Sequence, residues 1–153
     1  FILIGSFYIF YIIYMFLPVA GPQFYFPVID PALVAGGPYP EIGNYFNLHP
    51  EISIAQSGKG GLFTHLVGMA QASGERPTAA FPSSHIGIST VIIILAWRAK
   101  KWLFFSLLPF YLLLCCATVY IKAHYLVDAF AGVATGVLFY LLTAKIFDKY
   151  MKE

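Results

Sequence analysis

Apolar residues gather in four long runs along the chain. The runs cover residues 1–17, 84–96, 102–119 and 125–147. An almost unbroken apolar run of this length is typical of a helix surrounded by lipid or by other helices rather than by water. Prolines and glycines follow the first run and end its helix. The pattern therefore predicts four helices, of which the last three are joined by short connections.

The region between the first and second runs has a different composition. Residues 18–50 are rich in Pro, Gly, Tyr and Phe, which predicts a long irregular loop at a membrane interface. Residues 51–72 are too polar to span a bilayer comfortably, and we expect a short surface or re-entrant helix there. The stretch 18–80 is thus predicted as one loop that carries a short helix.

Composition indicates the surroundings of these helices. Of the 153 residues, 59% are hydrophobic and 10% are charged, against about 45–50% and about 25% in an average soluble domain. Disorder is excluded because disordered chains are poor in apolar residues. The net charge of +2 provides no dense basic stripe for nucleic acid. We predict an all-α integral membrane helix bundle that forms one domain over residues 1–153, with further N-terminal spans expected before it.

Small residues in the apolar runs have structural interpretations. Gly132 and Gly136 are four residues apart, a spacing that lets two membrane helices approach closely. Cys115 and Cys116 are adjacent in the third run, where a disulfide between them is geometrically unfavourable. No cysteine spacing typical of a zinc site is present. We therefore interpret both cysteines as small side chains that face lipid or the core.

The cations indicate the orientation of the bundle. Arg98, Lys100 and Lys101 stand in one turn, and further lysines follow the last run: Lys145, Lys149 and Lys152. If the helices alternate in direction, both groups lie on one side, which is cytoplasmic by the positive-inside rule. The opposite end of the bundle is then extracytoplasmic, either periplasmic or luminal.

Three ionisable residues at that opposite end have the spacing of a catalytic group. His85 opens the second run, His124 precedes the last, and the rise of the helices between them brings both to one face. Asp128 follows His124 by four residues, so its carboxylate can accept the Nδ1 proton and leave Nε2 as nucleophile or base. In-line transfer predicts reactive nitrogens about 4–8 Å apart. The alternative is that the His–Asp pair only caps a helix.

The two histidine segments resemble the signatures of the type 2 phosphatidic acid phosphatase superfamily. Residues 81–85 read FPSSH, like the family's Pro-Ser-x-His element, and His124 to Asp128 form the His-x-x-x-Asp element within VYIKAHYLVDAFAG. The subgroup most similar to this chain includes the inositol phosphorylceramide synthases, which tend to have a cation two residues before the histidine. Lys122 occupies that position.

The resemblance implies a role for each matched residue. It implies that His124 attacks phosphorus and forms a phosphohistidine, that Asp128 orients His124, and that His85 protonates the leaving alkoxide. It also implies a set of phosphate-binding residues: Lys122, Arg76, Ser83 and Ser84. Free N–H groups at a helix N-terminus form a ready anion site. The resemblance implies no metal and no other cofactor.

One element of the family pattern differs in this chain. The family has a lysine ahead of an Arg-Pro pair, and Arg76 with Pro77 matches the pair, whereas Met69 occupies the lysine position. Lys59, or Gln23 in the turn after the first run, is the candidate replacement for the missing contact.

These observations predict a membrane-bound lipid-phosphate phosphatase that acts through a phosphohistidine, with a phosphorylated lipid and the bilayer as partners. Hydrolysis is favoured over transfer because water is always available and the sequence indicates no second headgroup pocket. Two alternatives stay open. One is a phosphotransferase that moves a phospho-headgroup between lipids, as the subgroup implies. The other is a non-catalytic subunit of a larger membrane assembly.

Overall fold

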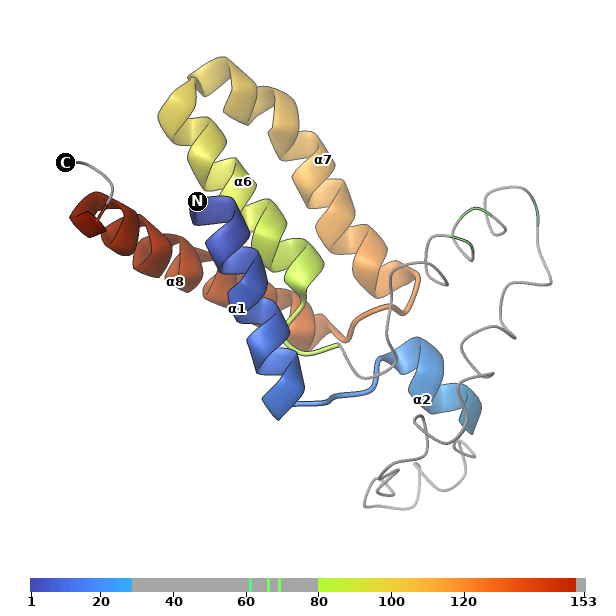
Figure 1. The fold of residues 1–153 in the computed structure, drawn as a ribbon. Coiled ribbons are helices and arrows are strands. Elements are labelled where there is room, and N and C mark those ends of the chain that lie inside the picture. The colour runs from blue at the N-terminus through green and yellow to red at the C-terminus, as the bar shows by residue number, and fades with distance from the viewer. Residues whose placement is uncertain (29–60, 62–65, 67–68, 70–79, 151–153) are drawn as a thin grey trace.

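The computed structural model describes residues 1–28, 61, 66, 69 and 80–150, and in this part of the chain every regular element is a helix. The helices are α1 (Ile2–Phe16), α2 (Pro22–Val28), α6 (Ser84–Ala99), α7 (Lys101–Tyr120) and α8 (Leu126–Tyr150). Figure 1 shows α6 between α7 and the crossing pair of α1 and α8. The predicted all-α class is confirmed, and each of the four predicted helices is present within a few residues of its expected bounds.

The segment after the first run differs from the irregular loop predicted for it. Pro22 opens the short helix α2, a position where proline is favoured because its missing N–H would have no helical partner. Most of residues 29–79 lie outside the described part, including nearly all of the helix predicted over 51–72. Of that helix, Leu66 and Met69 are helical and exposed.

An aromatic contact holds α1 against the other two helices of the core. Phe10 of α1 is fully buried, and its ring lies 4.8 Å from that of Phe139 in α8, edge to face. A Cβ at Gly87 of α6 would lie 2.1 Å from the Phe10 ring. Ser6 and Thr143 add a buried hydroxyl contact of 3.3 Å between α1 and α8. One large side chain thus packs where three helices meet, and it fits only because α6 has a glycine there.

The crossing of α6 and α8 is equally close, as the spacing of two glycines in α8 predicts. A Cβ at Gly132 would lie 2.7 Å from the Ser83 carbonyl oxygen, and one at Gly136 would lie 2.5 Å from the Gly87 carbonyl oxygen. Real Cβ atoms do not approach backbone this closely. The predicted packing role of both glycines is therefore confirmed, and it brings the start of α8 against the start of α6.

The outer surface of the bundle is strongly apolar. Helices α7 and α8 are both long and apolar enough to cross a membrane, and α1 and α6 are shorter apolar helices. Large apolar side chains are widely exposed, among them Phe110 at 70% and Phe130 at 69%. A soluble monomer seldom exposes apolar surface on this scale, which marks a membrane or protein contact.

The basic residues around the α6–α7 turn and those near the end of α8 lie at the end of the bundle away from α2 (Figure 1). Arg98 donates a hydrogen bond to the hydroxyl of Tyr140, so the turn between α6 and α7 lies beside the C-terminal half of α8. The ammonium of Lys101 sits 2.8 Å from the centre of the Trp97 ring. The two basic groups, around Arg98 and after the last helix, therefore lie towards the same end, as the alternating helix directions predict.

Candidate active site

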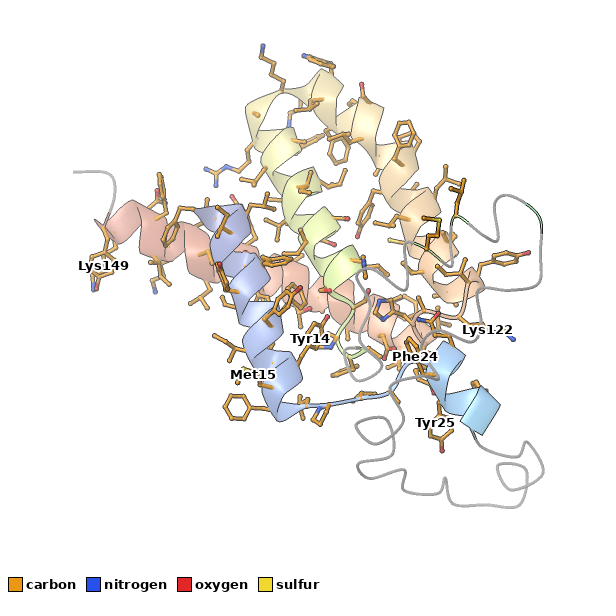
Figure 2. The ribbon with its side chains drawn as sticks, turned by 45° about the vertical axis from the view of Figure 1, so that its right-hand side comes forward. Tyr14, Met15, Phe24, Tyr25, Lys122 and Lys149 are labelled. Carbon is orange, nitrogen blue, oxygen red and sulfur yellow. The ribbon has the colours of Figure 1, made fainter. Side chains whose placement is uncertain are left out.

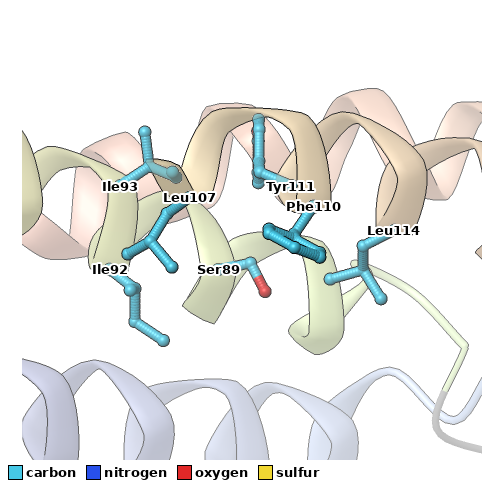
Figure 3. A pocket seen from close by; sticks show the side chains of 7 residues that line it. All are labelled: Ser89, Ile92, Ile93, Leu107, Phe110, Tyr111 and Leu114. Carbon is cyan, nitrogen blue, oxygen red and sulfur yellow. The ribbon is translucent and has the colours of Figure 1, made fainter. Parts of the chain in front are cut away.

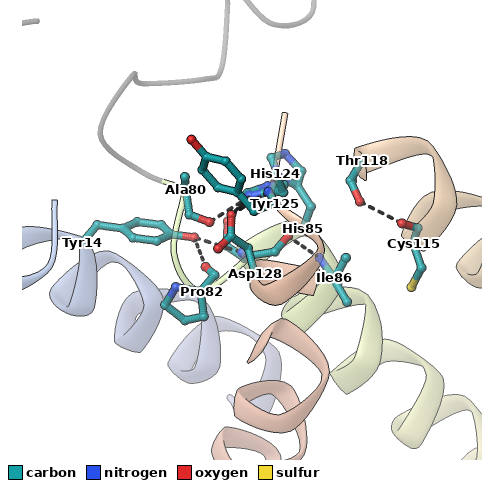
Figure 4. A network of polar contacts seen from close by, with 12 residues as sticks. Tyr14, Ala80, Pro82, His85, Ile86, Cys115, Thr118, His124, Tyr125 and Asp128 are labelled. Carbon is teal, nitrogen blue, oxygen red and sulfur yellow. Dashed lines mark hydrogen bonds and ion pairs between the residues drawn. The ribbon is translucent and has the colours of Figure 1, made fainter. Parts of the chain in front are cut away.

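The two histidines singled out in the sequence touch each other where α6 begins and α7 ends. His85 Nδ1 lies 3.4 Å from His124 Nε2, and the ring centres are 5.7 Å apart. Figure 4 shows both rings among the polar residues between the helix ends. The nitrogens are nearer than the expected 4–8 Å because the two rings meet directly. The two histidines are 39 residues apart in the sequence, and the fold makes each the contact partner of the other.

The tautomer of His124 is set by a backbone carbonyl. His124 Nδ1 lies 2.8 Å from the carbonyl oxygen of Ala80, and since a carbonyl can only accept, Nδ1 carries the proton. Ala80 is itself held by its N–H, which donates to the Val19 carbonyl at 3.1 Å. Nε2 therefore keeps its lone pair and directs it towards His85. This is the protonation state that a nucleophilic or basic imidazole needs.

Asp128 lies beside His124 without taking the hydrogen bond that the spacing predicts. Its Oδ2 is 3.9 Å from His124 Nδ1, beyond hydrogen-bonding distance. The same oxygen accepts the Tyr125 N–H at 2.8 Å, which is the reach-back half of a capping box at the start of α8. The carboxylate therefore caps the helix and places negative charge close to the imidazole, while the Ala80 carbonyl orients the ring.

Burial keeps His124 neutral. The residue is 4% exposed, and removal from water lowers its pKa from 6.5 to about 4, with a further lowering from His85 opposed by the Ala80 hydrogen bond. Burial penalises the charged imidazolium and leaves the neutral ring almost unaffected. At neutral pH the free Nε2 lone pair is thus available, whereas His85 is exposed at the mouth of the site.

The backbone amides at the start of α6 are already engaged within the chain. The Ser84 N–H donates to the hydroxyl of Tyr14 at 2.9 Å, and the Ser83 N–H donates to the Asp128 carbonyl at 3.2 Å. The Ile86 N–H points to the Ser83 hydroxyl at 3.4 Å. These three amides therefore bind the fold together, rather than forming the open anion site expected at this helix start. The side-chain hydroxyl of Ser84, half-buried next to His85, stays a candidate phosphate donor.

The remaining candidates lie at the edge of this cluster or outside the described residues. Lys122 is exposed, with a φ of 61° in the left-handed region, and Figure 2 shows its side chain directed outwards. Its carbonyl accepts the N–H of Gln23 at 2.9 Å, so the α7–α8 loop is tied to α2. Arg76 and Lys59 fall outside the described residues.

Two contributors to the site were not predicted from the sequence. Tyr14 of α1 donates to the Pro82 carbonyl at 2.8 Å while accepting the Ser84 N–H, across 68 residues of sequence from Pro82. The Ala80 carbonyl is the other. A tyrosine in an apolar run resembles an interface residue, and a backbone carbonyl leaves no trace in a sequence, so neither had a signal. The structure thus adds a brace for the FPSSH segment and an orienting group for His124.

Within the described residues, no group of three or more His, Cys, Asp or Glu side chains converges as a metal site. Both cysteines are free thiols, Cys115 partly covered and Cys116 exposed. The polar cluster therefore consists of two imidazoles, one carboxylate, hydroxyls and backbone groups. Such a set can perform nucleophilic attack and proton transfer.

Comparison with known proteins gives a match at the level of the family. The family profile described as the PAP2 superfamily matches residues 1–142. This range includes α1, both histidines and most of α8. Neither the search of curated proteins nor the search of solved structures found a match.

Proposed function

Since the chain belongs to the PAP2 superfamily, we propose that it is a membrane phosphatase that hydrolyses a phosphorylated lipid through a phosphohistidine. Family membership suggests phosphatase or phosphotransferase activity. The observation that carries the specific proposal is the His85–His124 contact of 3.4 Å, in which a backbone carbonyl fixes the tautomer of the buried ring. The buried, neutral ring of His124 suits a nucleophile, and the exposed ring of His85 in contact with it suits a proton donor.

The first step forms a bond between phosphorus and nitrogen. His124 Nε2 attacks the phosphorus of the lipid phosphate, and the bond from phosphorus to the lipid oxygen breaks. His85 donates its proton to that oxygen, so the lipid leaves as a neutral alcohol. The phosphoryl group must lie between nucleophile and leaving group, and so the two rings separate from their direct contact when substrate binds. Asp128, 3.9 Å from Nδ1, stabilises the positive charge that develops on His124.

The second step reverses these roles. A water molecule attacks the phosphorus and gives its proton to His85, and the phosphorus–nitrogen bond breaks. Inorganic phosphate leaves, and His124 returns to its neutral state with Nδ1 bonded to Ala80. The low pKa of His124 favours this release, because a poorly basic imidazole is a better leaving group from phosphorus.

Charge on the phosphate requires donors around it. Lys122 and Arg76 are the proposed cations, with the Ser84 hydroxyl as a polar contributor. Ser83 is fully buried and caps α6 with its hydroxyl, so its proposed part is to hold the segment that bears Ser84. Lys122 lies in the same loop as His124. In the proposal, its long side chain rotates so that the ammonium approaches the two histidine rings.

The bilayer surrounds the apolar helices in this proposal. Helices α7 and α8 cross it, and the large exposed apolar side chains contact lipid. The histidine end then lies at the extracytoplasmic surface, because the basic end follows the positive-inside rule. A lipid phosphate at that surface reaches the site without leaving the membrane.

The full chain, purified in lipid nanodiscs, provides the test. Incubation with a lipid phosphate such as dodecyl phosphate should release inorganic phosphate, and rapid acid-free quenching with labelled substrate should trap an acid-labile, base-stable phosphoprotein. The His124→Ala variant should lose the label and nearly all turnover. Lys101→Met is the matched control, since this cation lies at the opposite end, and it should retain both. Turnover by His124→Ala at the wild-type rate would contradict the proposal.

The same assay separates the alternatives. If the chain is a phosphotransferase, adding an inositol- or glycerol-type acceptor diverts the phosphoryl group into a new ester, and the release of inorganic phosphate falls. A chain with no turnover and no phosphoprotein, on a panel of lipid phosphates, would instead indicate a non-catalytic subunit.

A further inference from the structure

An apolar groove lies between α6 and α7, separate from the polar cluster. Its volume is about 290 Å³. Three side chains of each helix form most of its walls, as Figure 3 shows: Ser89, Ile92, Ile93, Leu107, Phe110 and Leu114. The groove thus follows the two helices that end at the histidines.

The remaining wall residue is Tyr111, and its hydroxyl already makes a hydrogen bond within the protein. The Thr90 hydroxyl donates to the Ile86 carbonyl at 2.8 Å, so in its 2.9 Å contact with Tyr111 the tyrosine hydroxyl is the donor. That donor therefore points away from any ligand, and the ring alone faces the groove. The walls consequently present hydrocarbon, apart from Ser89.

On both walls the groove begins one helical turn from the residues of the proposed active site. Ser89 follows His85 by one helical turn, and residues four apart lie on the same face. On α7, Leu114 precedes Thr118 by one turn, and the Thr118 carbonyl accepts the His124 N–H at 3.2 Å. From the histidines, both walls lead away towards the α6–α7 turn, which is the direction of the apolar interior.

We propose that this groove holds one alkyl or prenyl chain of the lipid whose phosphate reacts at His124. The inference rests on the proposed function and names its substrate class as esters in which a long hydrocarbon chain leads directly away from the phosphate. A phosphate at the histidines leaves its chain at Ser89, where the apolar walls begin. The groove's volume of about 290 Å³ provides room for a stretch of one hydrocarbon chain.

Chain-length dependence tests the proposal in nanodiscs with the full chain. Butyl, octyl and dodecyl phosphate are compared with p-nitrophenyl phosphate, which has no chain to place. Partition into the bilayer favours long chains equally for every variant, so the readout is the ratio of wild-type to variant kcat/KM.

Two variants fill the groove at different depths. Leu107→Trp fills the far part of the groove, and Leu114→Trp fills the part nearest His85. Leu113→Trp is the control, because Leu113 is 65% exposed and does not line the groove.

The expected ratios follow from the transfer of methylene groups. Each buried CH₂ contributes about 0.8 kcal/mol, or about fourfold, so a loss of two or three gives roughly 15–60-fold. Leu107→Trp should show this loss on dodecyl phosphate, with ratios near one on butyl and p-nitrophenyl phosphate. Leu114→Trp should already reduce turnover of octyl phosphate. Leu113→Trp should show ratios near one throughout.

Several results would overturn the inference. If the ratio of wild-type to variant kcat/KM did not change with the substrate's chain length in either groove variant, the substrate's hydrocarbon chain would bind elsewhere. An altered oligomeric state in Leu107→Trp, with unchanged ratios, would assign the groove to a second copy of the chain. A dodecyl phosphate with a diazirine at its chain end gives a readout independent of turnover, and its label should fall on the 107–114 segment. Failure of the proposed function is distinguishable, because wild type would then hydrolyse no substrate, including p-nitrophenyl phosphate.

Discussion

His85 and His124 differ in exposure, and this difference is the basis of their proposed roles. His124 is buried, and its Nδ1 proton is held by a carbonyl, so it changes protonation state with difficulty. His85 is exposed, so its ring is in direct contact with solvent. A nucleophile benefits from the first environment and a proton shuttle from the second. In the proposed mechanism, the contact between the rings therefore joins two residues of the same type that have different roles.

Removal of His85 should affect substrates according to their leaving groups. His85→Ala should slow release of an alkoxide about 10²–10⁴-fold, the usual contribution of general acid catalysis. With p-nitrophenolate, which needs no proton to leave, the loss should be much smaller. Steady-state kinetics on octyl phosphate and p-nitrophenyl phosphate provide the comparison. Equal losses on both substrates would show that His85 is not the general acid.

The buried His124 should also make stability depend on pH. Its pKa is about 4 when folded and about 6.5 when unfolded. Between these values the unfolded chain binds more protons, so the stability that is complete above pH 6.5 is lost as pH falls towards 4. The difference of about 2.5 pH units corresponds to about 3 kcal/mol. Thermal unfolding followed by the fluorescence of Trp97 and Trp102 should show this decline, and His124→Gln should reduce it. Identical pH profiles would contradict the assignment of a buried neutral ring.

At the scale of elements, the site depends on contacts between helices that are distant in sequence. Tyr14 links α1 to both the Pro82 carbonyl and the Ser84 amide, one on each side of Ser83. Tyr14→Phe removes this link and leaves a partly buried amide without its acceptor, which costs about 1–3 kcal/mol. We expect a lower Tm and a lower kcat, because the segment that bears His85 is no longer held.

Tyr11→Phe is the matched control for Tyr14, since it lies one turn earlier on α1 and is 53% exposed. It should leave both Tm and kcat near wild type. If the Tyr14 variant lost stability while the kcat of its folded fraction stayed unchanged, the tyrosine would be a structural brace only.

The glycines of α8 provide a second prediction at this scale. Gly136→Ala places a methyl group 2.5 Å from the Gly87 carbonyl oxygen, and such overpacking costs about 1–3 kcal/mol, more than the about 0.5–1 kcal/mol gained in helix propensity. Gly132→Ala displaces Ser83 and should therefore also reduce turnover. Thermal unfolding and phosphatase assays of both variants separate the effects. Ala134→Val, on the exposed side of α8, is the control, and an equal loss there would contradict the packing argument.

The sequence was informative about elements and about the identity of the histidines, but not about how they are held. Four apolar runs predicted four helices because composition alone decides which segments avoid water. Helix α2 was missed because seven residues opened by proline give no periodic signal. Asp128 was predicted to bind His124 directly, since the spacing brings the two close. Spacing does not reveal that a carbonyl at Ala80, placed by a contact with Val19, competes successfully for the same proton.

At the scale of the whole molecule, the proposed chemistry and the charge distribution give the bundle a direction. Arg98, Lys101 and Lys149 lie towards one end, and both histidines lie where α2 and the α7–α8 loop meet at the other. The groove between α6 and α7 leads from one end towards the other. In the proposed function, the phosphate site, the groove for the substrate's hydrocarbon chain and the basic end therefore follow one another along one axis of the bundle.

This direction can be measured by labelling cysteines in intact cells. In a background where Cys115 and Cys116 are replaced by serine, Leu126→Cys reports on the histidine end and Lys101→Cys on the basic end, since both positions are exposed. An impermeant maleimide should label Leu126→Cys before lysis and Lys101→Cys only afterwards, because the positive-inside rule retains the basic turn in the cytoplasm. The reversed pattern would move the active site to the cytoplasmic leaflet. Labelling of both positions before lysis would show that the two ends are not separated by a membrane, which would exclude α7 as a span.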